Sequence, residues 1–429
     1  MRSLKTIRLL LVGLVSLGVV LMAADGNAGQ KGLNSQAARE LTDAGLDKYL
    51  GAFTPVSSTP HALDWTKHTF DTDGGNGPIC IAGTPYSVFT KPGNPEKLLI
   101  FLQGGGACWE GFPACNMTAE AQFPPPAAFL PGIFKEDPQN DIGDWSVLYL
   151  PYCDGSVFGG DNDVVDTSFP GGVRRHRGLR NLSAGMDVAK AEFRRLEKIL
   201  VAGSSAGGVG AAAFSPFLAR LLYGNNVELF VFNDAGPLAL NPAGAPDAAE
   251  ARAADWDFAK FYPESCVDCD PLDQQTAIIQ WRLDNDSTIR EAFYETDGDL
   301  TNIGFASVNV PGFFDPLPPI IPFPDGLTQS DYRAILDAEH GALNASHPDR
   351  YKRFIVSGDN GLCFGGRVVL SHTALQGGNL VSFGCPGIDL FYDLEVNGVP
   401  LVQWTNDFVK PPGNQSVWID NVEAFVPFP

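Results

Sequence analysis

A serine between small residues stands out at positions 203–208, where the chain reads GSSAGG. The apolar run KILVAG leads into it, and an Ala- and Leu-rich segment ending at Gly224 follows it. A G-x-S-x-G pattern between a buried strand and a helix is typical of a nucleophile elbow, a tight turn that exposes a reactive serine. The glycines bracket Ser205 rather than Ser204, and small neighbours permit the strained backbone that such a turn needs. We predict that Ser205 is a nucleophile. A glycine-rich turn without chemistry is the alternative.

A second glycine-rich stretch, LQGGGACW at 102–109, follows the apolar run KLLIFL. Attack of a serine on an ester creates an oxyanion, which backbone N–H groups can stabilise where no side chain blocks them. The predicted oxyanion-hole residues are Gly105 and Gly106 in this stretch and Ala206, whose N–H follows the serine. The alternative is a plain tight turn.

Four motifs occur in order along the chain: LQGGGACW, YCDGSVFGGD at 152–161, HRGLRN at 176–181 and GSSAGG. Their order and approximate spacing resemble those of the pectin acetylesterase and Notum-type carboxylesterase family. The tail FYDLEVNGVPLVQW is similar to the C-terminal part of the same family. The resemblance implies an α/β-hydrolase fold, a Ser-Asp-His triad that needs no cofactor and no metal, and cleavage of short acyl esters carried on larger molecules.

In α/β hydrolases the acid follows the serine and precedes the histidine. We predict that TAIIQW at 276–281 is a late strand, and Asp284 and Asp286 come soon after it. The family places its acid at such a strand end, and the spacing to Ile289 and Phe293 favours Asp286. Either carboxylate could instead cap a helix.

The same order decides which histidine could be the base. Three of the six histidines precede the serine and do not fit. His340 and His347 lie before the strand predicted at YKRFIVSG and are expected to be solvated. The family carries its histidine just after this strand, whereas here the strand runs into DNGLCFGG. The first histidine after this strand is His372, in SHTALQGG, and we predict it as the base. Without a working base the chain would be a binding protein.

Several apolar runs must form the scaffold that positions these residues. They are KLLIFL, WSVLYLPYC, KILVAG, VELFVF, TAIIQW and RFIVSG. Continuous runs of this kind predict strands buried on both faces. The segment 181–198 between them has helical spacing, with Ser183 as its expected N-cap. Alternating strands and helices predict a mostly parallel α/β sheet flanked by helices.

The N-terminus has the pattern of a secretory signal, with Arg2, Lys5 and Arg8 before an apolar run and small residues. We predict a signal peptide at 1–28, an N-terminal extension at 29–75 and one hydrolase domain at 76–429. Cap-like insertions are expected near 241–271 and 308–327. The protein is expected to be secreted or periplasmic, without stable membrane insertion after signal cleavage.

The net charge of −21 argues against nucleic acid and anionic membranes as partners, because both are bound by Lys and Arg. The expected partner is an acylated carbohydrate or a small ester, and the expected state is a monomer. Pectin itself is anionic and would need a favourable local charge. A lipase or polyester depolymerase on the same fold, and a catalytically impaired carbohydrate- or lipid-binding module, are the alternatives.

Eight cysteines in an exported chain predict disulfides. The resemblance implies two pairs, Cys80 with Cys153 and Cys108 with Cys115. By elimination the other pairs are Cys266 with Cys269 and Cys363 with Cys385, although many connectivities are possible. A zinc site at the Cys-x-x-Cys of 266–269 lacks a second pair or a nearby histidine.

Overall fold

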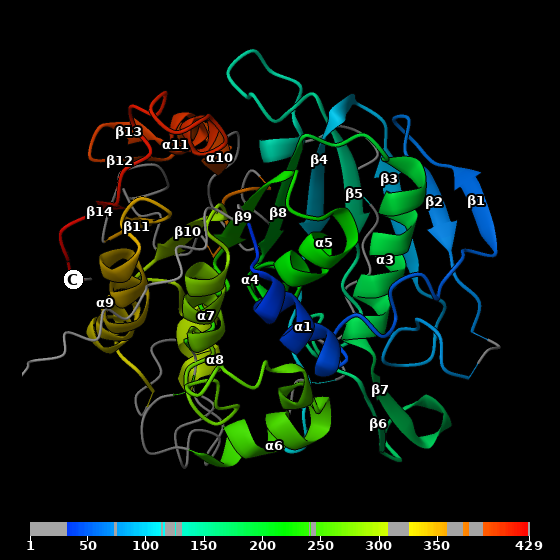
Figure 1. The fold of residues 1–429 in the computed structure, drawn as a ribbon. Coiled ribbons are helices and arrows are strands. Elements are labelled where there is room, and N and C mark those ends of the chain that lie inside the picture. Colours follow the sequence, from blue (N-terminus) through cyan, green and yellow to red (C-terminus); the bar gives the residue numbers. More distant parts are fainter. Residues whose placement is uncertain are drawn as a thin grey trace, which may run out of the picture. The chain divides into compact units, whose positions relative to one another are not determined.

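A ten-stranded sheet forms the centre of the molecule (Figure 1). The computed structural model describes residues 32–72, 75–112, 115, 125, 131–239, 241, 246–307, 326–357, 372–376 and 389–427. The spatial order of the strands is β1-β2-β3-β5-β4-β8-β9-β10-β11-β14. Their bounds are β1 Ser57–Pro60, β2 Thr66–Thr69, β3 Ser87–Lys91, β4 Asn94–Leu102, β5 Trp145–Leu150, β8 Lys198–Ser204, β9 Glu228–Asp234, β10 Arg290–Thr296, β11 Tyr351–Val356 and β14 Asn421–Val422.

The strands from β5 through β14 pair in parallel, whereas β1, β2 and β3 join antiparallel at one edge. This is the predicted α/β-hydrolase class of fold. Five predicted strand runs form β4, β5, β8, β9 and β11. The carboxyl ends of the parallel strands lie at one edge of the sheet, which is where ligands bind in open α/β sheets.

Alternate residues of the central strands enter two hydrophobic cores. In β4, Leu98, Ile100 and Leu102 face one core, and Leu99 and Phe101 face the other. This alternation follows from the two-residue period of a strand. Helices that pack on the first core are α1 Ser35–Asp43, α3 Gly178–Glu192, α4 Ala206–Ala212, α5 Ser215–Tyr223, α7 Ala277–Asn285, α8 Leu300–Ser307 and α9 Gln329–Ser346. Those on the second core are α10 Leu390–Asp393 and α11 Leu401–Phe408.

Two local predictions were wrong. The run TAIIQW does not form a strand, because Ala277–Asn285 is helix α7 and buries Ile278, Ile279 and Leu283 along one face. The neighbouring strand is β10, in which all seven residues are buried. Ser183 does not cap a helix either, since α3 begins five residues earlier and Ser183 lies buried inside it.

Residues 29–75, expected as an extension, contribute β1 and β2 to the main sheet and α1 to its helical layer. The expected boundary at 76 thus falls inside the sheet. From residue 32 onward the described residues belong to one compact unit. The predicted signal peptide, and residues 308–325 of the second insertion, lie outside the described residues.

The described part of the chain contains three disulfides, and each is one of the expected pairs. They join Cys80 to Cys153, Cys108 to Cys115 and Cys266 to Cys269. The fourth expected pair, Cys363 with Cys385, lies outside the described residues. Within the residues described, none of the helices combines the length and the apolar character that a membrane span requires.

Candidate active site

Ser205 occupies the turn between β8 and helix α4, Ala206–Ala212, with φ 58° and ψ −122°. This backbone conformation is rare for a residue with a side chain, and such strain is concentrated at functional sites. Neighbouring glycines make the turn possible. A Cβ on Gly207 would lie 2.0 Å from the carbonyl oxygen of Leu102, and one on Gly203 would lie 2.2 Å from the carbonyl oxygen of Gly207. The G-x-S-x-G pattern is therefore a steric requirement of this turn.

The structure brings Ser205 and His372 into direct contact. His372 Nε2 lies 2.6 Å from Ser205 Oγ, and His372 Nδ1 lies 2.5 Å from Asp299 Oδ2. A carboxylate can only accept, so the Nδ1–H donates to Asp299 and Nε2 is left to accept the serine hydroxyl proton. The three residues form a Ser-His-Asp array from three distant parts of the chain.

The acid of this array is Asp299, which the sequence reasoning missed. Asp299 follows β10 and precedes helix α8, Leu300–Ser307. Its Oδ1 accepts hydrogen bonds from the N–H groups of Thr301 and Asn302, while its Oδ2 faces His372. One carboxylate therefore caps a helix and orients the imidazole, and the helix cap fixes the direction of the second oxygen.

Asp286 and Asp284, the predicted acids, do not reach His372. Asp286 is buried against Arg220, with its Oδ2 2.6 Å from Arg220 Nε, and also accepts from two backbone N–H groups of its own turn. Asp284 lies near the surface, 3.0 Å from His347. Both assignments depended on reading residues 276–281 as a strand, which moved the expected strand end to the wrong place.

The other late histidines are held in different surroundings. His340 is not solvated as expected, because it is buried in α9, stacks on Phe293 and contacts Tyr351 and the carbonyl oxygen of Pro237. Burial lowers the pKa of His340 to about 3 and keeps its ring neutral. Neither His340 nor His347 approaches Ser205 in the described part of the chain.

Glu295 is a second buried acid behind Asp299. It accepts hydrogen bonds from Asn302 Nδ2 and Tyr332 Oη, each at 2.9 Å, and its carboxyl is hydrogen-bonded to Asp299. Burial, together with the Asp299 charge, raises the pKa of Glu295 well above its usual range. Ionising two adjacent buried carboxyl groups costs much free energy, because their negative charges repel each other. Glu295 is therefore the protonated partner and donates a hydrogen bond to Asp299.

The pKa of His372 reflects two opposing effects. Burial lowers the pKa, while the charge and hydrogen bond of Asp299, with a further contribution from Asp234, raise it. The carboxylates prevail, and the pKa lies above the ordinary value of 6.5. An imidazole with a raised pKa is a stronger base, which suits removal of a serine proton.

Donors for an oxyanion lie on both sides of Ser205. The N–H groups of Gly105, Gly106 and Ala206 have no hydrogen-bond partner among the described residues. The carbonyl oxygen of Gly105 lies 3.4 Å from Ser205 Oγ. Because the C=O and N–H of a trans peptide point in opposite directions, the Gly106 N–H is directed away from Oγ in this structure. The N–H groups of Gly105 and Ala206, which have no partner among the described residues, remain as the candidate donors.

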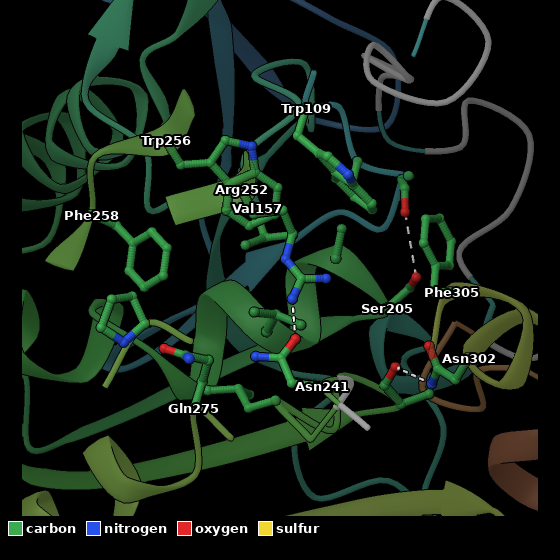
Figure 2. A pocket seen from close by; sticks show the side chains of 18 residues that line it. Trp109, Val157, Ser205, Asn241, Arg252, Trp256, Phe258, Gln275, Asn302 and Phe305 are labelled. Atoms are coloured by element: carbon green, nitrogen blue, oxygen red, sulfur yellow. Dashed lines mark hydrogen bonds between the residues drawn. The ribbon is translucent and has the colours of Figure 1, made fainter. Parts of the chain in front are cut away.

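A pocket opens directly beside Ser205 (Figure 2). Its cavity volume is about 100 Å³, whereas a single water needs about 10–15 Å³ on the same measure. The pocket is larger than an acetyl group requires. Its lining is mostly apolar, with a few polar groups, and includes Trp109, Val157, Leu238, Asn241, Arg252, Trp256, Phe258, Gln275, Asn302 and Phe305.

Much of one wall comes from the first insertion, where α6, Pro246–Trp256, carries Arg252 and Trp256. The Arg252 guanidinium donates to Asn241 and lies 5.2 Å from the centre of the Trp109 ring. No carboxylate in the described part of the chain pairs with it. Burial lowers the pKa of Arg252 to about 10, which still leaves it charged at neutral pH. Among the described residues that line the pocket, Arg252 therefore supplies a positive charge that no carboxylate offsets.

The fold is of the α/β-hydrolase class. Ser205, His372 and Asp299 have the arrangement of a Ser-His-Asp triad. A family model described as pectinacetylesterase matches residues 61–242. The resemblance to the pectin acetylesterase and Notum-type family that the four motifs indicated is confirmed by this match and by the relatives described next.

Two relatives are palmitoleoyl-protein carboxylesterases from Xenopus laevis, notum1' at 26% identity and notum1 at 28% identity, each over 156 residues. Each match covers 33% of this chain and 30% of the relative, so the chain matches under a third of the length of either protein. A crystal structure of the Wnt deacylase Notum from Drosophila has a similar fold, with a TM-score of 0.51 at 18% identity, covering 81% of this chain and 93% of that one.

Proposed function

We propose that this protein is a serine carboxylesterase that hydrolyses acyl esters through a Ser205-His372-Asp299 triad. The observation that carries the proposal is the continuous array from Asp299 to Ser205, with contacts of 2.5 and 2.6 Å. The strained turn at Ser205 and the unpaired N–H groups beside it support the same chemistry.

The reaction follows from this geometry. His372 Nε2 takes the hydroxyl proton as Ser205 Oγ bonds to the ester carbonyl carbon. The N–H groups of Gly105 and Ala206 stabilise the resulting oxyanion, and Asp299 stabilises the imidazolium. The proton passes from His372 to the departing alcohol, which leaves an acyl-enzyme. Water, deprotonated by His372, then releases the acid and restores the serine.

The natural substrate is proposed to be a short acyl ester, such as an acetyl ester, on a carbohydrate or small molecule. Arg252, which pairs with no carboxylate among the described residues, favours an ester that also carries a negative group, because a charge-assisted hydrogen bond to an anion is stronger than one to a neutral group. It provides the favourable local charge that an acidic protein of net charge −21 otherwise lacks for such substrates. The apolar lining gives a specific reason to test longer acyl chains, as a lipase would require.

The test is hydrolysis of p-nitrophenyl acetate, butyrate and octanoate by the wild-type protein and by Ser205→Ala and His372→Ala. Turnover that both substitutions abolish supports the triad, and its dependence on acyl length separates an acetylesterase from a lipase. Turnover that survives Ser205→Ala contradicts the proposal. Absence of turnover in the wild type would favour the catalytically impaired binding module instead. The short contact between Ser205 and His372 argues against that alternative.

We also propose that the protein acts outside the cytoplasm. The three disulfides support this, because such bonds form and persist in oxidising compartments. Detection of the protein in the culture medium or periplasm, with its N-terminus starting near residue 29, would test the proposal.

A further inference from the structure

Asp234 is a buried carboxylate next to the triad that has no part in the proton transfer described above. It is the last residue of β9, which lies between β8 and β10 in the sheet. β8 leads to Ser205 and β10 leads to Asp299, so Asp234 sits between the strands that carry the nucleophile and the acid. Its side chain is fully buried.

Asp234 holds the nucleophile turn through two contacts. Its backbone carbonyl oxygen accepts the N–H of Ser205 at 2.7 Å. Its Oδ2 accepts the hydroxyl of Ser204 at 2.5 Å. The residue before the nucleophile and the nucleophile itself are thus tied to the same aspartate.

The same carboxylate holds the segment that carries the base. Its Oδ1 accepts the N–H of Ala374 at 2.9 Å, and its Oδ2 accepts the N–H of Leu375 at 3.0 Å. These residues follow His372 by two and three positions. His372 does not belong to a helix or strand, so the hydrogen bonds that Asp234 accepts from Ala374 and Leu375 help to hold its segment in place.

We propose that Asp234 is a positioning residue that sets the relative placement of Ser205 and His372 by binding both segments with one side chain and its own backbone. The inference rests on the proposed function. It assigns Asp234 no contact with substrate. Ionised Asp234 offers enough lone pairs for Ser204, Ala374 and Leu375 together, whereas a protonated or amide side chain loses acceptor capacity on one of its two atoms.

Asp234 also acts on His372 through charge. Burial raises the pKa of Asp234 to about 6, so the group is largely ionised at neutral pH. Its negative charge raises the pKa of His372, in addition to the larger effect of Asp299. Among the described residues, Glu295 is a further titratable group near this pair, and it is hydrogen-bonded to Asp299. Removing the Asp234 charge should therefore lower the pKa of His372.

The test compares Asp234→Asn with Asp407→Asn. Asp407 is a control with a similar set of donors: it is buried, accepts from one serine hydroxyl and two backbone N–H groups, and belongs to α11 rather than to the site. Unlike Asp234 it also pairs with Lys410, so its stability is measured alongside its rate. We expect Asp234→Asn to lower kcat for p-nitrophenyl acetate by about 10²-fold with little change in KM, the loss typical of misplaced reacting groups. We also expect the acid limb of its kcat/KM profile to move to lower pH. Asp407→Asn should change neither kcat nor the limb.

A folded Asp234→Asn variant with wild-type kcat and an unmoved acid limb would overturn the proposal. If Asp234→Asn does not fold, Ser204→Ala decides instead, because it removes one of the three donors and leaves the aspartate in place. A fall in kcat for Ser204→Ala with unchanged KM supports the proposal, and wild-type kcat contradicts it. The rate of Ser205→Ala is subtracted from every measured rate. If nothing remains for the wild type after this subtraction, the esterase proposal itself has failed, which is a different outcome from a failure of the Asp234 proposal.

Discussion

The assignment of Asp299 as the triad acid can be tested against Asp286, the acid that the sequence favoured. Asp299→Asn changes the partner of His372 Nδ1 without changing side-chain size. The amide can still accept from Thr301 and Asn302 through its oxygen, which turns its NH₂ group toward His372. That group donates to Nδ1, so the imidazole proton moves to Nε2, where it blocks acceptance of the serine proton.

The two substitutions should affect different quantities, kcat for Asp299→Asn and the free energy of unfolding for Asp286→Asn. For Asp299→Asn we expect kcat to fall by about 10³- to 10⁴-fold, as in other triads with this change, which is about 4 to 5 kcal/mol of transition-state stabilisation. Asp286→Asn instead breaks the fully buried ion pair with Arg220. Loss of one partner of such a pair costs about 3 to 5 kcal/mol of folding free energy. Its kcat should stay near that of the wild type.

The assays are initial rates with p-nitrophenyl acetate and urea unfolding followed by tryptophan fluorescence, on both variants and the wild type. Rates are corrected for the folded fraction, so that lost stability is not mistaken for lost catalysis. A variant Asp286→Asn with a collapsed kcat, beside an active Asp299→Asn, would refute the argument from the His372 contact. It would restore the assignment made from the sequence.

Three further outcomes are expected. The kcat/KM of the wild type should rise with pH through a limb above pH 6.5, because the pKa of His372 is raised and only the neutral imidazole can accept the serine proton; a limb at or below 6.5 would contradict this. Glu295→Gln should keep most of the wild-type kcat, because an amide can donate to Asp299 as the protonated acid does. Glu295→Ala should lower kcat, because alanine cannot donate. Equal kcat values for the two variants would contradict the role of Glu295 as a donor. Arg252→Gln should raise KM by about tenfold or more for the acetyl ester of a carboxylated nitrophenol and leave KM for p-nitrophenyl acetate unchanged; equal effects on both would show that Arg252 does not recognise charge.

The elements with strong local signals could be predicted from the sequence. Long apolar runs marked β4, β5, β8, β9 and β11, since a strand buried on both faces must be apolar throughout. The turn at Ser205 was predictable because only glycine fits at Gly203 and Gly207. The order of residues in the chain also singled out His372, the histidine that the structure places against Ser205.

The acid could not be predicted in this way. A short apolar run such as 276–281 fits a buried helix face as well as a strand, and periodicity alone does not separate the two. Choosing the strand shifted the expected strand end and directed attention to Asp286. The strand actually ends at Thr296 and is followed by DGDL, so Asp299 could have been found only by recognising β10 in a run that contains Arg290, Glu291 and Glu295. Those charges are buried in the sheet and disguise the strand.

The sequence by itself determined the kind of turn that exposes Ser205, the class of fold and the family resemblance, because each depends on residues that are neighbours in the chain. Only the tertiary structure decided which carboxylate faces His372 and that Asp234 joins the serine turn to the histidine segment. These contacts span 73 and 140 residues. They exist because parallel strands end at one edge of the sheet, where residues far apart in the chain become neighbours.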